Sequence, residues 1–231
     1  MKLSIVIPVF NERDTLAQIV ERVRAVKLPG VSKEIVLVDD CSSDGSRELI
    51  RDELTAAEDV TAYYHEVNLG KGAALRTGFA AATGELVVVQ DGDLELDPAD
   101  LPAVLQPLVA GRADVVFGSR FLDRGRGSFG LPTYLANRIL TALTNRVYAL
   151  SLTDMEAGYK AFRRSQLARI TLRSERFGFE PEVTAKLARL GLVIQEVPVR
   201  YVGRSRAAGK KMRVRDGFKA AAAILWFRLF D

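Results

Sequence analysis

The sequence predicts an α/β protein built on a mainly parallel sheet, and two observations support this class. Short apolar runs rich in β-branched residues alternate with segments whose apolar residues recur at helical spacing, a pattern typical of strands separated by covering helices. The 231 residues, 48% hydrophobic and 27% charged, are enough for a substantial core, and they exclude a peptide, a fibre or a disordered tail. The expected strands are 3–9, 34–39, 60–64, 86–90, 114–118 and 193–201.

Helix-period segments lie between and after these strands. Asp97 is expected to cap one of them, and Pro98 suits its first turn, where a backbone N–H has no helical partner. The expected helices are 13–26, 46–54, 73–82, 98–109, 131–150, 180–189 and about 214–230. We therefore divide the chain into a main domain, 1–212, and a C-terminal amphipathic helix, 213–231.

Positive charge is concentrated near the end of the chain. Residues 200–231 hold nine Lys and Arg against two Asp, so this stretch carries +7 and the remainder −3 of the net +4. Such a local excess is directed at phosphates, nucleic acid or an anionic membrane. The longest apolar run, 220–227, is far shorter than the roughly 20 residues that cross a bilayer, so no transmembrane helix is expected.

The cysteine content and the first residues indicate the compartment. Cys41 is the single cysteine and cannot form an internal disulfide. Pro8, Asn11 and Glu12 interrupt the apolar segment that a signal peptide would need. We expect a cytoplasmic protein.

Polar residues follow three of the expected strands, at the edge where open α/β sheets bind ligands. The first strand runs into Asn11-Glu12, the second ends in Asp39-Asp40, and the fourth ends in a segment from Asp91 to Glu95. Two carboxylates one residue apart can chelate a hard divalent cation that neutralises a diphosphate. An isolated D-x-D also suits a solvated acidic turn, but its alignment with the other strand ends favours the metal.

Two common nucleotide motifs are absent. No G-x-G-x-x-G follows the first strand, and the run from Leu69 to Gly72 lacks the spacing of a phosphate-cradling P-loop. These absences argue against NAD binding and ATP hydrolysis. Gly70 and Gly72 are expected to permit a tight turn into the next helix.

Five segments in order resemble the signature of glycosyltransferase family 2, and the chain is most similar to its dolichol- or polyprenyl-phosphate mannosyltransferase branch. These segments are 5–12, 36–44, 68–72, 91–93 and 118–120. The resemblance covers essentially the whole chain. It implies a GT-A catalytic domain over 1–212, a nucleotide-sugar donor and Mg²⁺ or Mn²⁺ as cofactor.

The resemblance also implies the donor site. Asp91, Asp93 and Glu95 correspond to residues at the metal and the diphosphate. Phe10 stands where tyrosine is common, which preserves stacking but loses a hydroxyl, and Glu95 stands where glutamine is common, which adds a charge. The other donor-binding residues are Pro8, Phe10, Glu12, Val38, Asp40 and Gly92, with Arg204, Lys210 and Lys211 from a basic loop.

Two arginines resemble acceptor-phosphate ligands of the branch. Arg120 follows the fifth strand, and the alternative for its side chain is a surface ion pair with Asp123. Arg138 lies in a weakly matching stretch, so Arg146 is an alternative to it. With Asp93, Arg120 and Arg138 are the expected catalytic residues.

The expected reaction is inverting transfer of one sugar, mannose or glucose, from GDP-mannose or UDP-glucose to polyprenyl phosphate. A phosphate whose second pKa is about 6 needs no dedicated base, whereas a hydroxyl acceptor would require one, with Asp154 or Glu156 as candidates. The processive signature Q-x-x-R-W is absent, so one sugar per acceptor is expected. A nucleotidyltransferase and a non-catalytic membrane-associated module remain as alternatives.

The C-terminal helix is expected to dock the protein on the cytoplasmic face of an anionic membrane. The alternative is that its apolar face packs on the domain or on a second copy, so a homo-oligomer stays open. No nucleic-acid partner is expected. The apolar residues are Phe218, Ile224, Leu225, Trp226, Phe227, Leu229 and Phe230, and the basic residues are Arg213, Arg215, Lys219 and Arg228.

Overall fold

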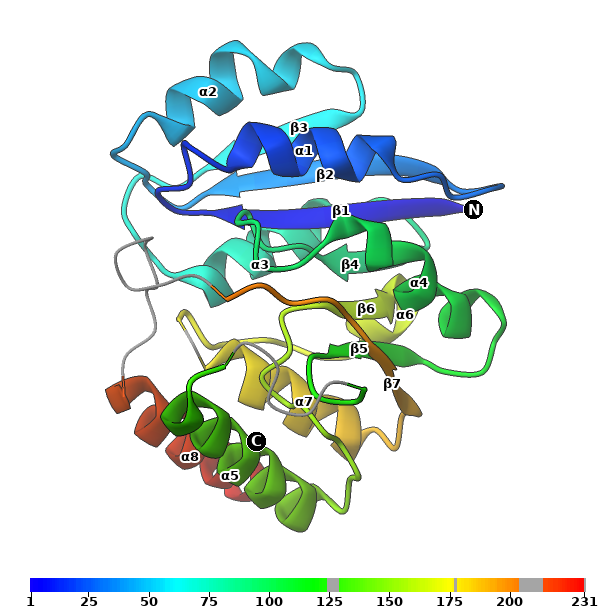
Figure 1. Ribbon diagram of the computed structural model, residues 1–231, viewed down its shortest axis with the longest axis vertical. Helices are drawn as coiled ribbons and strands as arrows, with labels where there is room; N and C mark the ends of the chain where they lie inside the picture. Colours follow the sequence, from blue (N-terminus) through cyan, green and yellow to red (C-terminus); the bar gives the residue numbers. More distant parts are fainter. Residues whose placement is uncertain (124–128, 177, 204–213, 231) are drawn as a thin grey trace.

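A computed structural model describes residues 1–123, 129–176, 178–203 and 214–230. Its strands are β1 (Lys2–Val9), β2 (Ser32–Asp39), β3 (Val60–Tyr64), β4 (Leu86–Val89), β5 (Val115–Ser119), β6 (Lys160–Arg163) and β7 (Ile194–Pro198). Within these residues they form one sheet in the order β3-β2-β1-β4-β6-β5-β7 (Figure 1). Neighbouring strands are parallel except where β6 pairs with β4 and β5. The predicted α/β class with a mainly parallel sheet is confirmed.

The helices lie close to their predicted positions. They are α1 (Leu16–Ala25), α2 (Ser46–Asp52), α3 (Lys71–Ala81), α4 (Leu101–Val109), α5 (Leu131–Tyr148), α6 (Arg164–Leu167), α7 (Phe179–Arg189) and α8 (Val214–Leu229). Short 3₁₀ turns cover Leu54–Ala56 and Pro98–Asp100. The predicted cap is confirmed, because Asp97 Oδ1 accepts a hydrogen bond from Ala99 N at 3.0 Å. Strand β6 and helix α6 were not predicted.

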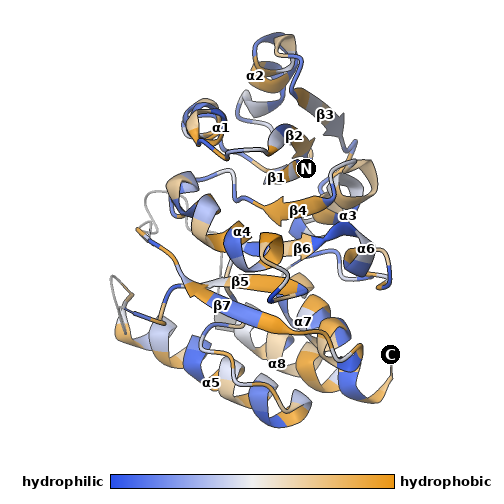
Figure 2. Cartoon of the chain, turned by 90° about the vertical axis from the view of Figure 1, so that its right-hand side faces the viewer, coloured by the Kyte–Doolittle hydropathy of each residue, from blue (hydrophilic) through white to orange (hydrophobic). Residues whose placement is uncertain are grey.

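The sheet is covered on both faces, as Figure 2 shows from the side. Alternate residues of β1 point to opposite faces, as the pleat of a strand requires. Leu3, Ile5 and Ile7 belong to a core that includes α1 and α4, whereas Val6 belongs to a second core that includes α3, α5, α7 and α8. Burial on both faces explains why these strands read as nearly continuous apolar runs.

Helix α8 packs beside α5 and α7 (Figure 1). Tyr148 Oη donates a hydrogen bond to the carbonyl oxygen of Ile224 at 2.7 Å, and Ile224 and Phe227 are buried in the second core. The predicted alternative, packing on the domain, therefore holds for this face of the helix, and these two residues are not part of an exposed surface. Phe218 and Trp226 remain exposed. The division of the chain at 212 stays a prediction.

Candidate functional site

The carboxyl ends of β1, β2 and β4 meet at one edge of the sheet, as the sequence predicts. Strand β1 lies between β2 and β4, with Val9 opposite Asp39. Thr15 Oγ1 joins two of the strand ends, because it donates to Glu12 Oε2 and to the carbonyl oxygen of Gly92, at 3.1 and 3.0 Å. A Cβ on Gly92 would lie 3.4 Å from the Pro8 carbonyl oxygen. Pro8, Glu12 and Gly92 are therefore neighbours.

Two other predicted donor residues differ in their surroundings. Phe10 is partly exposed just beyond β1. Val38 is fully buried in the second core, with its side chain against α3 at Gly78. Contact between Val38 and a nucleoside would therefore involve its backbone. The donor-binding role of both residues stays a prediction.

Asp40 organises the loop that leads into α3. Its Oδ1 accepts from Leu69 N at 2.9 Å, and its Oδ2 accepts from Gly70 N at 2.7 Å and from Asn68 Nδ2 at 2.9 Å. His65 Nδ1 lies 2.8 Å from the same Oδ1. The carboxylate of Asp40 therefore holds the glycine turn in place, and its predicted position beside the nucleoside remains untested.

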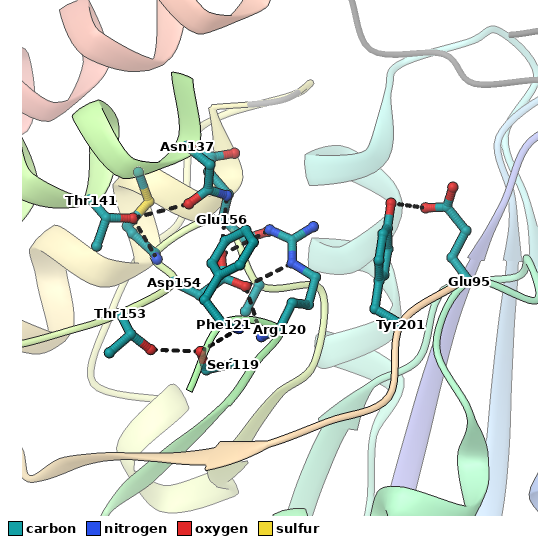
Figure 3. Close-up of polar contacts among 12 residues, drawn as sticks. Glu95, Ser119, Arg120, Phe121, Asn137, Thr141, Thr153, Asp154, Glu156 and Tyr201 are labelled. Carbon is teal, nitrogen blue, oxygen red and sulfur yellow. Dashed lines mark hydrogen bonds and ion pairs between the residues drawn. The ribbon is translucent and has the colours of Figure 1, made fainter. Parts of the chain in front are cut away.

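The acidic segment after β4 is held by contacts with two other parts of the chain. Asp91 Oδ1 lies 2.8 Å from Lys71 Nζ, and a Cβ on Gly158 would lie 2.5 Å from Asp91 Oδ2, so the absence of a side chain there makes room for the carboxylate. Asp93 Oδ1 accepts a hydrogen bond from Glu95 N at 3.0 Å. Glu95 Oε2 accepts one from the hydroxyl of Tyr201 at 3.0 Å (Figure 3).

The chemistry of these carboxylates suits a hard divalent cation, since Mg²⁺ and Mn²⁺ prefer oxygen ligands. Asp91 already binds a cationic group, the ammonium of Lys71. No three His, Cys, Asp or Glu side chains in the described part of the chain are gathered as a metal site. Asp91 and Asp93 fit the predicted cation in type and spacing, and Glu95 accepts a hydrogen bond from Tyr201 through Oε2.

Lys71 and Glu180 are polar residues of this site that the sequence interpretation missed. Lys71 Nζ also lies 3.2 Å from Glu180 Oε1, in the first turn of α7. Burial alone would lower the pKa of Lys71, but the charges of Asp91 and Glu180 outweigh it and hold that pKa above its ordinary value. Lys71 is therefore a cation at neutral pH. The only sequence signal was the glycine turn around it.

Arg120, after β5, forms a two-pronged ion pair with Asp154 (Figure 3). Its Nε lies 2.7 Å from Asp154 Oδ2, its Nη2 lies 2.8 Å from Oδ1, and Nη2 also donates to the carbonyl oxygen of Glu156 at 3.1 Å. The side chain of Arg120 is 12% exposed and that of Asp154 is fully buried. The alternative of an ion pair with Asp123 is wrong, because the carboxylate partner is Asp154.

Aromatic rings surround the guanidinium of Arg120. Its Cζ lies 5.6, 5.1 and 5.2 Å from the ring centres of Phe121, Phe129 and Tyr201, within the range of cation–π attraction. The rings of Phe129 and Tyr201 are stacked at 4.5 Å. Tyr201 therefore touches both the predicted acceptor arginine and, through its hydroxyl, the predicted metal carboxylate Glu95.

The two candidate bases are poorly suited to accept a proton. Burial raises the pKa of Asp154, but the charge and hydrogen bonds of Arg120 outweigh this and hold it below its ordinary value. Asn137 Nδ2 donates to the same carboxylate at 3.1 Å. Burial, followed by the charge of Glu180, raises the pKa of Glu156 well above its ordinary value. A base needs a free, ionised lone pair facing substrate, which neither geometry favours.

The remaining predicted basic residues are in different places. Arg138 is exposed on α5, and its Nη1 donates to the carbonyl oxygen of Thr153, next to Asp154, at 3.0 Å. Arg146 is exposed in the last turn of α5, two helical turns further on. Arg138 is therefore nearer to the Arg120–Asp154 pair along the helix. Arg204, Lys210 and Lys211 lie outside the described residues.

The fold and the site together define a GT-A-like α/β protein with an acidic edge beside a buried arginine. A crystal structure of glucosyl-3-phosphoglycerate synthase from Mycobacterium tuberculosis has the same fold, with a TM-score of 0.74 at 23% identity, over 100% of this chain and 82% of that one. Residues 4–171 match glycosyl transferase family 2, and the chain belongs to this family.

Two curated relatives share a type of acceptor in their names. One is the undecaprenyl-phosphate 4-deoxy-4-formamido-L-arabinose transferase of Edwardsiella ictaluri, 32% identical over 210 residues, which are 90% of this chain and 62% of that protein. The other is the dodecaprenyl-phosphate galacturonate synthase of Rhizobium johnstonii, 31% identical over 186 residues, 78% of this chain and 53% of that protein. The chain thus spans between half and two thirds of these relatives. No helix in its described residues is long and apolar enough to cross a membrane.

Proposed function

We propose that this chain is a glycosyltransferase that moves one sugar, with inversion, from a nucleotide-sugar donor to polyprenyl phosphate. The observation that carries the proposal is the polar edge at the strand ends, where Glu12 lies beside Gly92, and Lys71, after the turn that Asp40 holds, contacts Asp91. Tyr201 links Glu95 of the same acidic segment to Arg120, the partner of Asp154. Family membership and relatives named for polyprenyl-phosphate sugar transfer support it. Those relatives carry different sugars, so mannose and glucose are two members of a wider set of donors to test.

On the donor side, Asp91, Asp93 and Glu95 would hold Mg²⁺ or Mn²⁺. When bound, such a cation neutralises the diphosphate that departs from the sugar. Pro8, Phe10 and Glu12 lie where β1 ends and would bind the nucleoside. Asp40 would act by keeping the glycine turn before α3 in place.

On the acceptor side, Arg138 is the exposed cation that would meet the lipid phosphate. Arg120 is already paired with Asp154, so it would contact the lipid phosphate through the remaining edge of its guanidinium. A phosphate acceptor is mostly ionised near neutral pH and needs no base. The surroundings of Asp154 and Glu156 therefore support a phosphate acceptor over a hydroxyl.

A peripheral position on the cytoplasmic face of an anionic membrane completes the proposal. Leu131, Leu135 and Ile139 recur at every fourth residue of α5 and are all exposed, so they form one apolar stripe. Helix α8, packed beside it, and the residue that follows it expose a second group: Phe218, Leu225, Trp226, Leu229 and Phe230. The exposed cations of these helices include Arg138, Arg146, Lys219 and Arg228. Apolar side chains among basic ones are typical of helices that lie in a membrane surface.

The test is a transfer assay with Mn²⁺, a short polyprenyl phosphate and a panel of donors that includes GDP-mannose and UDP-glucose. Mass spectrometry of the lipid fraction should show addition of one sugar and no longer products. Formation of nucleotide-sugar from sugar 1-phosphate and NTP would instead identify a nucleotidyltransferase. Donor binding without any transfer to lipid phosphate or to hydroxyl acceptors would indicate a binding module.

A further inference from the structure

The ammonium of Lys71 contacts the carboxylate of Asp91, one of the proposed metal ligands. It lies 2.8 Å from Asp91 Oδ1 and 3.2 Å from Glu180 Oε1, and its side chain is only 21% exposed. Asp91 belongs to the proposed metal segment, whereas Glu180 belongs to α7 on another part of the chain. One internal cation therefore bridges a proposed metal ligand and a carboxylate outside that segment.

The backbone around Lys71 is fixed on both sides. Gly70, before it, has a φ of +98°, and a Cβ there would lie 2.6 Å from the carbonyl oxygen of Glu175. A Cβ on Gly72, after it, would lie 2.3 Å from the carbonyl oxygen of Ser174. Asp40 also holds the Gly70 N–H at 2.7 Å. Any movement of the ammonium must therefore come from rotation of the lysine side chain.

Glu180 offers a second position for the same ammonium. Its Oε2 is buried and has no hydrogen-bond partner among the described residues, while its Oε1 already contacts Lys71. A buried carboxylate oxygen without a partner is costly, and pairing it with an ammonium would remove that cost. A small rotation of the side chain would thus transfer Lys71 from Asp91 to both oxygens of Glu180.

We propose that Lys71 is an exchangeable counter-ion of Asp91, which moves onto Glu180 when a divalent cation binds. The inference rests on the metal site of the proposed function. An ammonium on Asp91 Oδ1 opposes a divalent cation on the same carboxylate, because the two positive charges repel each other at short range. In the free protein, Lys71 therefore competes with the metal.

The donor relieves this competition. A nucleoside diphosphate brings negative charge to the site, which offsets the combined charge of the metal and the displaced ammonium. Metal and nucleotide should therefore bind cooperatively, and by linkage each strengthens the other to the same extent. Loss of the lysine charge removes the competition, so the metal should bind tightly without nucleotide.

The experiment measures Mn²⁺ binding by electron paramagnetic resonance of the free ion, with and without UDP, and requires no turnover. The Mn²⁺ that the same concentration of UDP binds in a protein-free sample is subtracted. The variants are Lys71→Met, which keeps the apolar stem, and Lys71→Arg, which keeps the charge. Without UDP, Lys71→Met should bind Mn²⁺ about tenfold more tightly than the wild type, and UDP should strengthen its Mn²⁺ binding by a smaller factor than it does in the wild type. Lys71→Arg should retain weak binding without UDP and strengthening with it.

Two outcomes would overturn the inference, and an Asp93→Ala variant tells them apart. In the first outcome, the wild type binds Mn²⁺ with UDP and Asp93→Ala does not, but without UDP a folded Lys71→Met binds Mn²⁺ no more tightly than the wild type. The metal site then stands, and the counter-ion role of Lys71 is wrong. If no variant binds Mn²⁺ with or without UDP, both the metal site and the inference fail. Should Lys71→Met not fold, Lys71→Gln provides the same comparison.

Discussion

Removing the carboxylate of Asp154 should destabilise the fold strongly, because it leaves the guanidinium of Arg120 buried without its partner. The pair has N–O distances of 2.7 and 2.8 Å, and the side chains are 12% and 0% exposed. Breaking such a buried pair from one side costs about 3–5 kcal/mol of unfolding free energy. Asp154 also accepts hydrogen bonds from Arg120 N and Asn137 Nδ2, which Asp154→Ala would leave unmade.

Urea unfolding of the wild type, Asp154→Ala and Asp123→Ala measures this cost directly. Asp123 lies exposed near the same strand end and should change the free energy of unfolding by no more than about 0.5 kcal/mol. In the double variant, Arg120→Met with Asp154→Leu, the free energy of unfolding should fall by less than the sum of the reductions in the two single variants. The difference should be about 1–3 kcal/mol.

The stabilisation of the fold by the Asp154 carboxylate should also decrease as the pH is lowered. The pKa of Asp154 is held below its ordinary value of 3.8, so its carboxylate stabilises the fold fully above pH 3.8 and loses this effect as the pH falls through the native pKa. The difference in free energy of unfolding between the wild type and Asp154→Ala should therefore have its largest value at pH 7 and decrease in acid. A folded Asp154→Ala whose free energy of unfolding at pH 7 falls by less than about 1 kcal/mol, but which no longer transfers sugar, would refute this reasoning. That result would identify Asp154 as a base.

Three further predictions concern other parts of the molecule. Burial alone would raise the pKa of Glu34, but hydrogen bonds from Lys2, Ser4 and Thr83 lower it to about 2. Glu34→Gln should therefore lower the free energy of unfolding in urea by about 1–2 kcal/mol at pH 7, and this loss should shrink as the pH falls toward and through about 2. Tyr201→Phe keeps the ring but loses the 3.0 Å hydrogen bond to Glu95, so calorimetry should show a free energy of unfolding lower by about 1 kcal/mol. An unchanged melting temperature would contradict that hydrogen bond. Ile139→Ser should weaken sedimentation with anionic liposomes, while Ala136→Ser, exposed on the same helix but to one side of the apolar stripe, should not. Equal pellets for both variants would count against docking through α5.

Local patterns in the sequence were sufficient to predict most of the fold. Strand β4 is apolar throughout, and β1 and β2 each contain a continuous apolar run, because both faces of the sheet are covered. This makes the three strands easy to recognise. Strand β6 was missed because it has four residues and begins with a lysine. Lys160 is fully buried there, and its ammonium donates to the carbonyl oxygens of Met155 and Ala157 at 2.9 and 2.7 Å. Only the folded chain provides those acceptors.

The site was predictable as far as strand ends could indicate it. Parallel strands bring their carboxyl ends to one edge, so residues such as Asp40 and Asp91 could be placed together from the sequence. The partner of Arg120 could not, because Asp154 is 34 residues further along the chain and reaches it through tertiary packing. The same holds for Lys71 and its contact with Glu180, which joins α3 to α7.

The most direct test of the proposed function is metal-dependent sugar transfer by Asp93→Ala, compared with Glu58→Ala, an exposed acid before β3, away from the site. Both variants should melt as cooperatively as the wild type, because neither side chain belongs to the hydrophobic core. With Mn²⁺, a nucleotide-sugar and polyprenyl phosphate, Glu58→Ala should form the glycolipid at the wild-type rate, and Asp93→Ala should lose it by a factor of about 100 or more. A folded Asp93→Ala with near-wild-type transfer would contradict the central claim that the acidic edge after β4 binds the metal and the donor diphosphate.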